Sequence, residues 1–270
     1  MTSLSRYCVA HGKSFDPDDI DPASKPFSQG SKANDLAHIA ALSDKISALQ
    51  ELLYANRSRS LLVVLQGTDT SGKDGAVRSV FSHVDPQGIN VVSFKAPTPQ
   101  EQEHDFLWRI HPQTPGAGKI TIFNRSHYED VLITRVKGWI DDDEAQRRLA
   151  HIRHFEQLLV DRGTVILKCF LHISKDEQKE RLQARLADPA KHWKFNVGDL
   201  EERKSWGAYQ AAYAAALSAT STAEAPWYVV PANSKTHRNV MIAELCLAAL
   251  KSMKLKPPKA NPAFAKIRIE

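Results

Sequence analysis

The sequence predicts an α/β fold in which a mainly parallel sheet of five strands is covered by helices on both faces. Five short segments rich in Val, Ile and Leu alternate along the chain with longer segments whose apolar residues recur at helical spacing. The strand segments are apolar nearly throughout, which is typical of strands buried on both faces. Their alternation with helices is typical of a parallel sheet.

The elements follow in order from local signals. The strands are expected at residues 61–66, 90–94, 119–124, 164–173 and 227–230. The helices are expected at residues 34–57, 72–83, 98–111, 128–136, 141–162, 175–186, 200–217 and 235–253. The helix at 34–57 has apolar residues three or four apart and few breakers. The helix at 98–111 has Pro at its second position, and the helix at 141–162 opens with four acidic residues that suit the positive end of the helix dipole.

The two ends of the chain carry little hydrophobic periodicity. Residues 14–33 mix Pro, Asp, Ser and Gly, so residues 1–33 are expected to form an extended N-terminal arm. Residues 254–270 are similar and are expected to form a C-terminal tail. The folded domain is therefore expected at residues 34–253.

The amino-acid composition excludes several classes of protein. The 270 residues carry a formal net charge of +5, which permits an anionic partner without naming one. Cys8, Cys169 and Cys246 are far apart, which argues against a disulfide framework and a zinc site. The N-terminus lacks the apolar core of a signal peptide, and no apolar run is long enough to cross a membrane. We therefore expect a cytoplasmic protein with no membrane partner.

A glycine-rich loop lies between the first strand and the helix that follows it. Its sequence, GTDTSGKD, fits the pattern GxxxxGK, in which backbone N–H groups and a helix N-terminus face a phosphate and the lysine adds a point charge. The alternative is a plain glycine-rich turn. The residues expected to bind phosphate are Gly67, Thr70, Ser71, Gly72, Lys73 and Asp74.

Two acidic residues make this loop unusual. Asp74 replaces the Ser or Thr that commonly follows the lysine and ligates Mg²⁺. Asp69, inside the loop, would repel a bound phosphate unless a cation lay between them. Asp69 is therefore expected to anchor Mg²⁺, with orientation of the acceptor as a second role and a helix cap or Asx-turn as the alternative.

The third strand ends in a polar sequence, NRSHYED. Asn124 is its first residue, and Arg125 is suited to bidentate contact with phosphate. Glu129 is expected to approach a metal or an acceptor nucleotide. By spacing, Ser126 and Glu129 also fit a helix capping box, and both roles are compatible.

A basic helix follows the fourth strand. Arg181 and Arg185 are four residues apart and therefore share a helical face. Mobile lids of nucleotide kinases donate such arginines to the transferred phosphoryl group, which places a candidate lid at residues 175–198. The alternative is a solvated face with ion pairs such as Glu177 with Arg181.

Taken together, residues 60–251 resemble the family-2 polyphosphate kinases. The resemblance rests on the motifs LQGTDTSGKDGAVR, SFKAPTPQEQEHDFLWRIH, IFNRSHYEDVL, HIRHFEQLL, HISKDEQKERLQARL, KHWKFNVGDL and APWYVVPANSK, which occur in the family's order. It implies a three-layer P-loop kinase fold like that of thymidylate kinase, with a helical lid. It also implies transfer of phosphate between inorganic polyphosphate and a nucleotide, dependent on Mg²⁺ or on Mn²⁺ in its place.

The resemblance also implies roles for individual residues. The family's loop residues correspond to Asp69 and Lys73, its lid arginines to Arg181 and Arg185, and its Asp-Arg pair at a strand end to Asn124 and Arg125. The change from Asp to Asn puts a metal contact at position 124 in doubt. That change, followed by Tyr-Glu-Asp, resembles the subgroup that accepts both nucleoside mono- and diphosphates. The expected catalytic residues are Asp69, Lys73, Arg125, Glu129, Arg181 and Arg185; the expected metal ligands are Asp69 and Glu129; and the expected nucleotide-binding residues are Lys95, Asp105, Arg109, Asn124 and Glu129.

The hypothesis is therefore a kinase that makes ADP from AMP and ATP from ADP with polyphosphate as the donor. A nucleoside monophosphate kinase that uses ATP is the nearest alternative, and a non-catalytic protein that binds polyanions or nucleic acid is the other. No RNA- or DNA-binding module is recognisable, so no nucleic-acid partner is expected. Adenine nucleotides are expected, with guanine nucleotides as alternatives, and the family implies a homodimer or homotetramer.

Overall fold

The fold is organised around a five-stranded sheet with the strand order β2-β3-β1-β4-β5, in which every neighbouring pair is parallel. The computed structural model describes residues 4–259, 261–262, 264 and 267–269. The strands are β1 (Ser60–Gln66), β2 (Ile89–Ser93), β3 (Ile120–Asn124), β4 (Thr164–His172) and β5 (Trp227–Pro231). The predicted fold class is therefore confirmed, with each strand within two residues of its predicted bounds.

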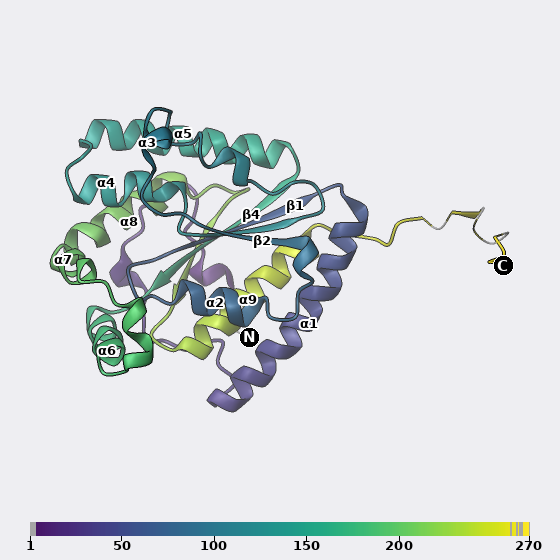
Figure 1. Cartoon of the computed structure of the whole chain (residues 1–270), viewed down its shortest axis with the longest axis horizontal. Coiled ribbons are helices and arrows are strands. Elements are labelled where there is room, and N and C mark those ends of the chain that lie inside the picture. Colours follow the sequence, from purple (N-terminus) through teal and green to yellow (C-terminus); the bar gives the residue numbers. More distant parts are fainter. Residues whose placement is uncertain (1–3, 260, 263, 265–266, 270) are drawn as a thin grey trace.

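Helices cover both faces of this sheet (Figure 1). One face packs against α1 (Lys32–Asn56), α2 (Lys73–Val80) and α9 (Lys235–Ser252). The other packs against α5 (Asp142–Asp161) and α8 (Trp206–Thr220). The apolar strands β1, β3, β4 and β5 are mostly buried under this cover, whereas the edge strand β2 is largely exposed.

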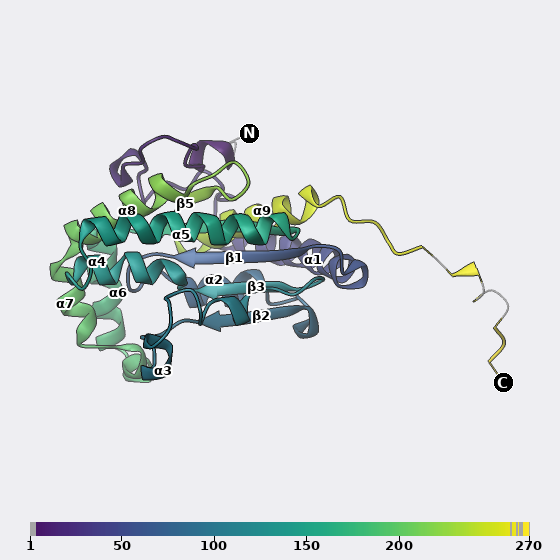
Figure 2. The same cartoon turned by 90° about the horizontal axis from the view of Figure 1, so that it is seen from above.

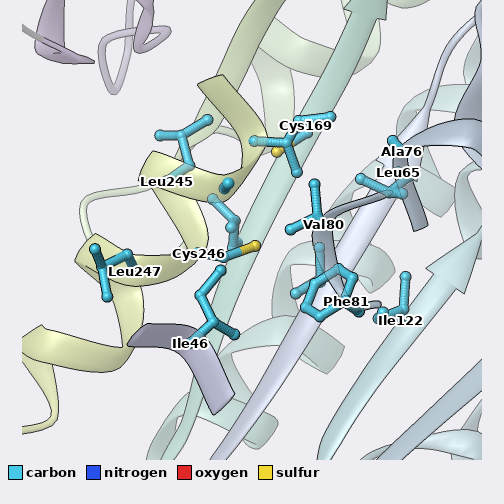
Figure 3. Close-up of a cluster of buried hydrophobic side chains, with 14 of the residues drawn as sticks. Ile46, Leu65, Ala76, Val80, Phe81, Ile122, Cys169, Leu245, Cys246 and Leu247 are labelled. Atoms are coloured by element: carbon cyan, nitrogen blue, oxygen red, sulfur yellow. The ribbon is translucent and has the colours of Figure 1, made fainter. Parts of the chain in front are cut away.

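Two of the three cysteines belong to the first of these hydrophobic layers. Cys169 of β4 and Cys246 of α9 lie among aliphatic side chains such as Leu65 and Val80 (Figure 3). Burial raises the pKa of Cys246 to about 12 and raises that of Cys169 well above its ordinary value. Both thiols, free in this structure, therefore act as small apolar groups of the core.

Four further helices complete the fold. They are α3 (Pro99–Gln102), α4 (Ile133–Val136), α6 (Lys175–Leu186) and α7 (Gly198–Lys204), with 3₁₀ turns at Leu4–Tyr7, Pro17–Asp19, Pro86–Gly88, His111–Gln113, His127–Val131 and Pro189–Lys194. Figure 2 shows that β1 and β2 run toward the end of the molecule where α6 and α7 lie. The candidate lid therefore lies at the carboxyl edge of the sheet.

Three predicted helices differ from the structure. The helix expected at 98–111 ends at Gln102, because the Asp105 side chain accepts a hydrogen bond from the Leu107 N–H at 2.9 Å and forms a turn there. The segment expected as a helix at 128–136 is a 3₁₀ turn followed by α4. The helix expected at 200–217 is two helices, α7 and α8, which meet at Ser205.

The described part of the N-terminal arm lies on the domain, along the β5 side of the sheet (Figure 2). The Val9 N–H donates to the Trp227 carbonyl at 2.8 Å, and the Asn233 N–H donates to the Pro22 carbonyl at 3.1 Å. Residues 1–3, 260, 263, 265–266 and 270 of the predicted arm and tail lie outside the described residues. Among the helices that the structure describes, none combines the length and apolar character needed to cross a membrane.

Candidate active site

The phosphate loop connects β1 to α2 in a conformation that few residue types adopt. Gly72 has a φ of +99°, and a Cβ there would lie only 1.8 Å from Nη1 of Arg238. Gly67 has a φ of +153°, and a Cβ there would lie 2.7 Å from the Leu171 carbonyl oxygen. Thr70 also has a positive φ, of 65°, without being glycine. Non-glycine residues with positive φ concentrate at functional sites, where the surrounding structure holds them.

The Lys73 side chain folds back over the loop. Its Nζ donates to the Gly67 carbonyl at 2.6 Å and lies 3.3 Å from the Thr68 carbonyl and 3.4 Å from Oγ of Ser71. Burial lowers the pKa of Lys73 to about 8, and the positive charge of Arg125 acts in the same direction. A phosphate at the loop would supply the negative charge that this buried ammonium lacks.

The end of β3 faces the loop across the carboxyl edge of the sheet. Asn124 is the register partner of Leu65, and its amide nitrogen donates to Oδ1 of Asp74 at 2.5 Å. Arg125, with a φ of 63°, pairs its Nη2 with Oδ1 of Asp69 at 2.7 Å. The structure therefore brings together both acidic residues of the loop and both polar residues of the strand end.

The Asp69 side chain does not act as a helix cap, because the N-cap of α2 is Gly72. Ser126 does cap the 3₁₀ turn at His127–Val131, but its Oγ accepts from the Tyr128 N–H at 3.2 Å, so the capping box that the spacing offered with Glu129 does not form. Glu129 interacts electrostatically with Arg125 instead. Burial raises the pKa of the Glu129 carboxyl, although the charges of Arg125 and Lys73 oppose this.

Arg181 is buried at the base of α6 and is fully engaged with the protein. Its Nη1 donates to the carbonyls of Thr70 and Ser71 at 2.9 and 3.1 Å, and its Nη2 donates to those of Ala232 and Asn233 at 2.7 and 2.8 Å. Its Nε donates to Glu177 at 2.7 Å, which is the ion pair that the sequence offered as the alternative. All five N–H groups of the guanidinium are thus used. A contact with a transferred phosphoryl group stays a prediction and would require some of these bonds to be exchanged.

Arg185, one turn further along α6, is more accessible. Its Nη1 donates to the Lys194 carbonyl at 3.2 Å and lies 3.5 Å from Oδ2 of Asp199. Burial raises the pKa of Asp199 to about 6, and repulsion from Asp69 adds to the shift. Asp199 was not among the predicted site residues, since nothing in its local sequence indicates that α7 faces the phosphate loop.

Of the five predicted nucleotide-binding residues, Glu129 interacts with Arg125 as described above, and the other four divide into two groups. Lys95 and Asn124 line the same cleft as the phosphate loop. Arg109 is buried outside that lining, where it donates to the Lys95 carbonyl at 2.8 Å and to Asp130 at 3.3 Å. Asp105 lines a separate, mainly apolar groove beside α5. The structure therefore does not bring Asp105 and Arg109 to the phosphate loop.

A cleft of about 810 Å³ lies between the phosphate loop, the end of β3 and the lid segment. Its basic side chains outnumber its acidic ones. The basic ones are Lys73, Lys95, Arg125, Arg181, Arg185, Lys191, Lys194, Lys235 and Arg238, and the acidic ones are Asp69, Asp74, Glu177, Glu180 and Asp199. Lys235 and Arg238 come from α9, and neither was among the predicted site residues. Such a wall suits a ligand with several negative charges.

The oxygen atoms at this cleft fit a hard divalent cation. Within the residues that the structure describes, no three acidic, His or Cys side chains converge as a metal site of their own. Mg²⁺ is commonly held by one or two carboxylates together with substrate phosphates, and Asp69 with Asp74 offers such a partial set. The hydroxyl oxygens of Thr68 and Thr70 are buried without a hydrogen-bond partner, which leaves further oxygen donors in the loop.

Comparison with known proteins identifies the family. Residues 29–258 match the family described as Polyphosphate kinase 2 (PPK2). The chain belongs to the polyphosphate kinase 2 family. It is 50% identical over 258 residues to an AMP/ADP-polyphosphate phosphotransferase of Meiothermus ruber, which covers 96% of this chain and 95% of the relative. It is 43% identical over 235 residues to an ADP-polyphosphate phosphotransferase of Rhodopseudomonas palustris, which covers 83% and 81% of the two chains.

The fold has a close counterpart among solved structures. The crystal structure of polyphosphate kinase 2 from Arthrobacter aurescens superposes with a TM-score of 0.93 at 47% identity, and the match covers 98% of this chain and 95% of the other. The P-loop kinase fold that the sequence resemblance implied is therefore confirmed for this PPK2 chain.

Proposed function

We propose that this PPK2 protein transfers the terminal phosphate of inorganic polyphosphate to AMP and ADP, forming ADP and ATP. One observation carries the proposal: a phosphate loop with a buried lysine opens into a cleft walled mainly by basic side chains from the loop, β3, α6 and α9. That wall is larger and more basic than a single phosphate group requires. Membership of the PPK2 family, and the AMP/ADP-polyphosphate phosphotransferase name of a relative 50% identical to this chain, support the same substrates.

The chemistry needs positioning and charge neutralisation more than covalent catalysis. An oxygen of the acceptor nucleotide attacks the terminal phosphorus of polyphosphate in line, and the shortened polyphosphate leaves. Lys73, Arg125 and Arg185 offset the negative charge of the transferred group. Asp69 and Glu129 orient the acceptor. Asp69, together with Asp74 at the cleft or with Glu129 as predicted, would hold the Mg²⁺, which supplies charge neutralisation on phosphate oxygens when bound.

Other parts of the assignment stay predictions. Use of guanine nucleotides, Mn²⁺ in place of Mg²⁺, and assembly as a homodimer or homotetramer are among them. The roles of Asp105 and Arg109 in nucleotide binding are also predictions. Neither residue lines the cleft, so a nucleotide that contacts them would have to extend beyond it.

The proposal is tested by an assay without ATP. Purified protein incubated with AMP, polyphosphate and Mg²⁺ is expected to form ADP first and then ATP, measured by chromatography of the nucleotides. A kinase that takes phosphate only from ATP would form neither product. A protein that retained polyphosphate on a filter and left AMP unchanged would show the non-catalytic alternative to be correct.

The pKa of Lys73 predicts how activity depends on pH. The ammonium attracts phosphate only while protonated, and its pKa is lowered to about 8, so its charge is lost as the pH rises through that value. We therefore expect kcat/KM for polyphosphate, which reports the free enzyme, to fall above about pH 8. Bound phosphate favours the protonated form, so kcat at saturating polyphosphate should decline only at higher pH. A kcat/KM that stayed constant to pH 9.5 would contradict the assignment of Lys73.

A further inference from the structure

Arg238 of α9 is a buried cation that contacts the phosphate loop and lines the cleft. Its Nη1 donates to the Ser71 carbonyl at 3.1 Å, and its Nε and Nη2 donate to Oδ1 of Asn239 at 3.0 and 2.8 Å. The same Ser71 carbonyl accepts from Arg181 at 3.1 Å. Two guanidinium groups from different helices therefore hold one carbonyl of the loop.

This contact determines where the next N–H group points. In a planar trans peptide the C=O and the N–H face opposite sides. Because the Ser71 carbonyl is turned toward Arg238 and Arg181, the Gly72 N–H is turned away from them. Over the part of the chain that the structure describes, no hydrogen bond occupies this N–H. It comes just before α2, where N–H groups commonly bind anions.

The close approach of Arg238 also explains the glycine. A Cβ on residue 72 would lie 1.8 Å from Nη1 and 2.8 Å from Cζ of Arg238. Any other residue at position 72 would push the guanidinium away from the Ser71 carbonyl. The glycine thus serves both the positive φ and the contact with Arg238.

The charge of Arg238 has no counter-ion in the described structure. Arg181 pairs with Glu177, whereas Arg238 makes no ion pair with a carboxylate among the described residues. Buried charges are costly unless they are paired, so an unpaired one beneath a phosphate site indicates that the ligand supplies the opposite charge. Burial lowers the pKa of Arg238 to about 9, with Arg181 adding to the shift, so the group is still charged at neutral pH.

We propose that Arg238 is a positioning residue for phosphoryl transfer: it fixes the Ser71–Gly72 peptide so that the Gly72 N–H faces the bound phosphate. This inference rests on the proposed function, because the phosphate is that of polyphosphate. Arg238 acts through the loop, and its cation adds positive potential beneath the transferred group.

The test compares Arg238→Gln and Arg238→Lys with wild type in the full chain. We expect Arg238→Gln to lower kcat about tenfold or more, because small misplacements of reacting groups are costly, while KM for polyphosphate changes less. Amide hydrogen exchange of residues 67–76 without substrate is expected to become faster in this variant. Arg238→Lys keeps the charge and one donor for Ser71, so its loss of kcat should be smaller and its loop exchange intermediate. If Arg238→Gln does not fold, the comparison is made with Arg238→Lys alone.

Ser43→Ala is the matched control. Oγ of the buried Ser43 donates to the Val80 carbonyl at 2.9 Å, at the end of α2 away from the loop. This variant is expected to lose some thermal stability but to keep its kcat and its loop exchange. Wild-type kcat and wild-type loop exchange in both Arg238 variants would overturn the inference. A raised KM with unchanged kcat would overturn it in favour of direct phosphate binding by Arg238. A wild-type protein that formed no ATP would instead overturn the proposed function, and hydrogen exchange would still decide whether Arg238 holds the loop.

Discussion

Replacing Lys73 with alanine is expected to lower kcat by about a hundredfold or more while leaving the fold intact. The ammonium lies over the phosphate loop, 2.6 Å from the Gly67 carbonyl, where it would meet the charge that develops on a transferred phosphoryl group. The variant should not be less stable than wild type. Burial lowers the pKa of Lys73, so the charged side chain is itself unfavourable in the folded state without a ligand.

The measurement is kcat with AMP and polyphosphate, together with a thermal unfolding curve. Lys119→Ala is the matched control, since Lys119 donates to the Gln87 carbonyl at 2.6 Å and precedes β3 at the opposite edge of the sheet. It is expected to keep wild-type kcat. Near-normal activity of Lys73→Ala would show that the charge on the transferred group is neutralised elsewhere.

The sequence predicted those parts of the fold and site that are determined by residues close together in the chain. The strands are uninterrupted apolar runs, and the phosphate loop is a contiguous segment whose glycines are required by its own backbone. α5 begins as expected because Asp141 caps it by accepting from the Glu144 N–H at 2.7 Å. Asn124 and Arg125 were placed beside the loop because the carboxyl ends of parallel strands share one edge of the sheet.

The parts that the sequence did not predict depend on contacts between distant segments. Arg238 meets Ser71 across 167 residues of chain. Burial, together with repulsion from Asp69, raises the pKa of Asp199 to about 6. The residues next to Asp199 in the sequence do not predict this burial. The helix expected at 98–111 had good starting signals, and its capping box at Thr98 and Glu101 does form. Beyond Gln102 the chain forms the Asp105 turn, and Arg109 donates to the Lys95 carbonyl, contacts that helical periodicity does not encode.

Arg181 lies where the sequence predicted it, and its contacts suggest a second role, in shaping the loop. The sequence placed it beside the phosphate loop, and the structure puts its guanidinium on the Thr70 and Ser71 carbonyls. Its N–H groups therefore hold the carbonyls of the loop. In this conformation Arg181 and Arg238 stabilise the loop, whereas Lys73, Arg125 and Arg185 are predicted to contact the phosphate directly.

Replacing Asp69 with asparagine is expected to lower kcat by about a hundredfold or more with little change in thermal stability. Asparagine has nearly the same shape and can still accept the hydrogen bond that Arg125 now gives Asp69 at 2.7 Å. The change therefore removes a charge and keeps the geometry. Stability should hardly change because the Arg125 side chain is 44% exposed, and ion pairs with such exposure contribute little.

Removing the charge of Asp69 should change how activity depends on the Mg²⁺ concentration. If the carboxylate attracts Mg²⁺ to the phosphates, Asp69→Asn should need a higher Mg²⁺ concentration for half-maximal activity than wild type does. Asp44→Asn is the control, because Asp44 also accepts from a basic side chain, His83, at 2.7 Å but lies outside the cleft. It is expected to keep both kcat and the wild-type Mg²⁺ dependence. A lowered kcat with an unchanged Mg²⁺ requirement would assign Asp69 to orienting the acceptor alone, whereas wild-type values for both would remove Asp69 from the catalytic residues.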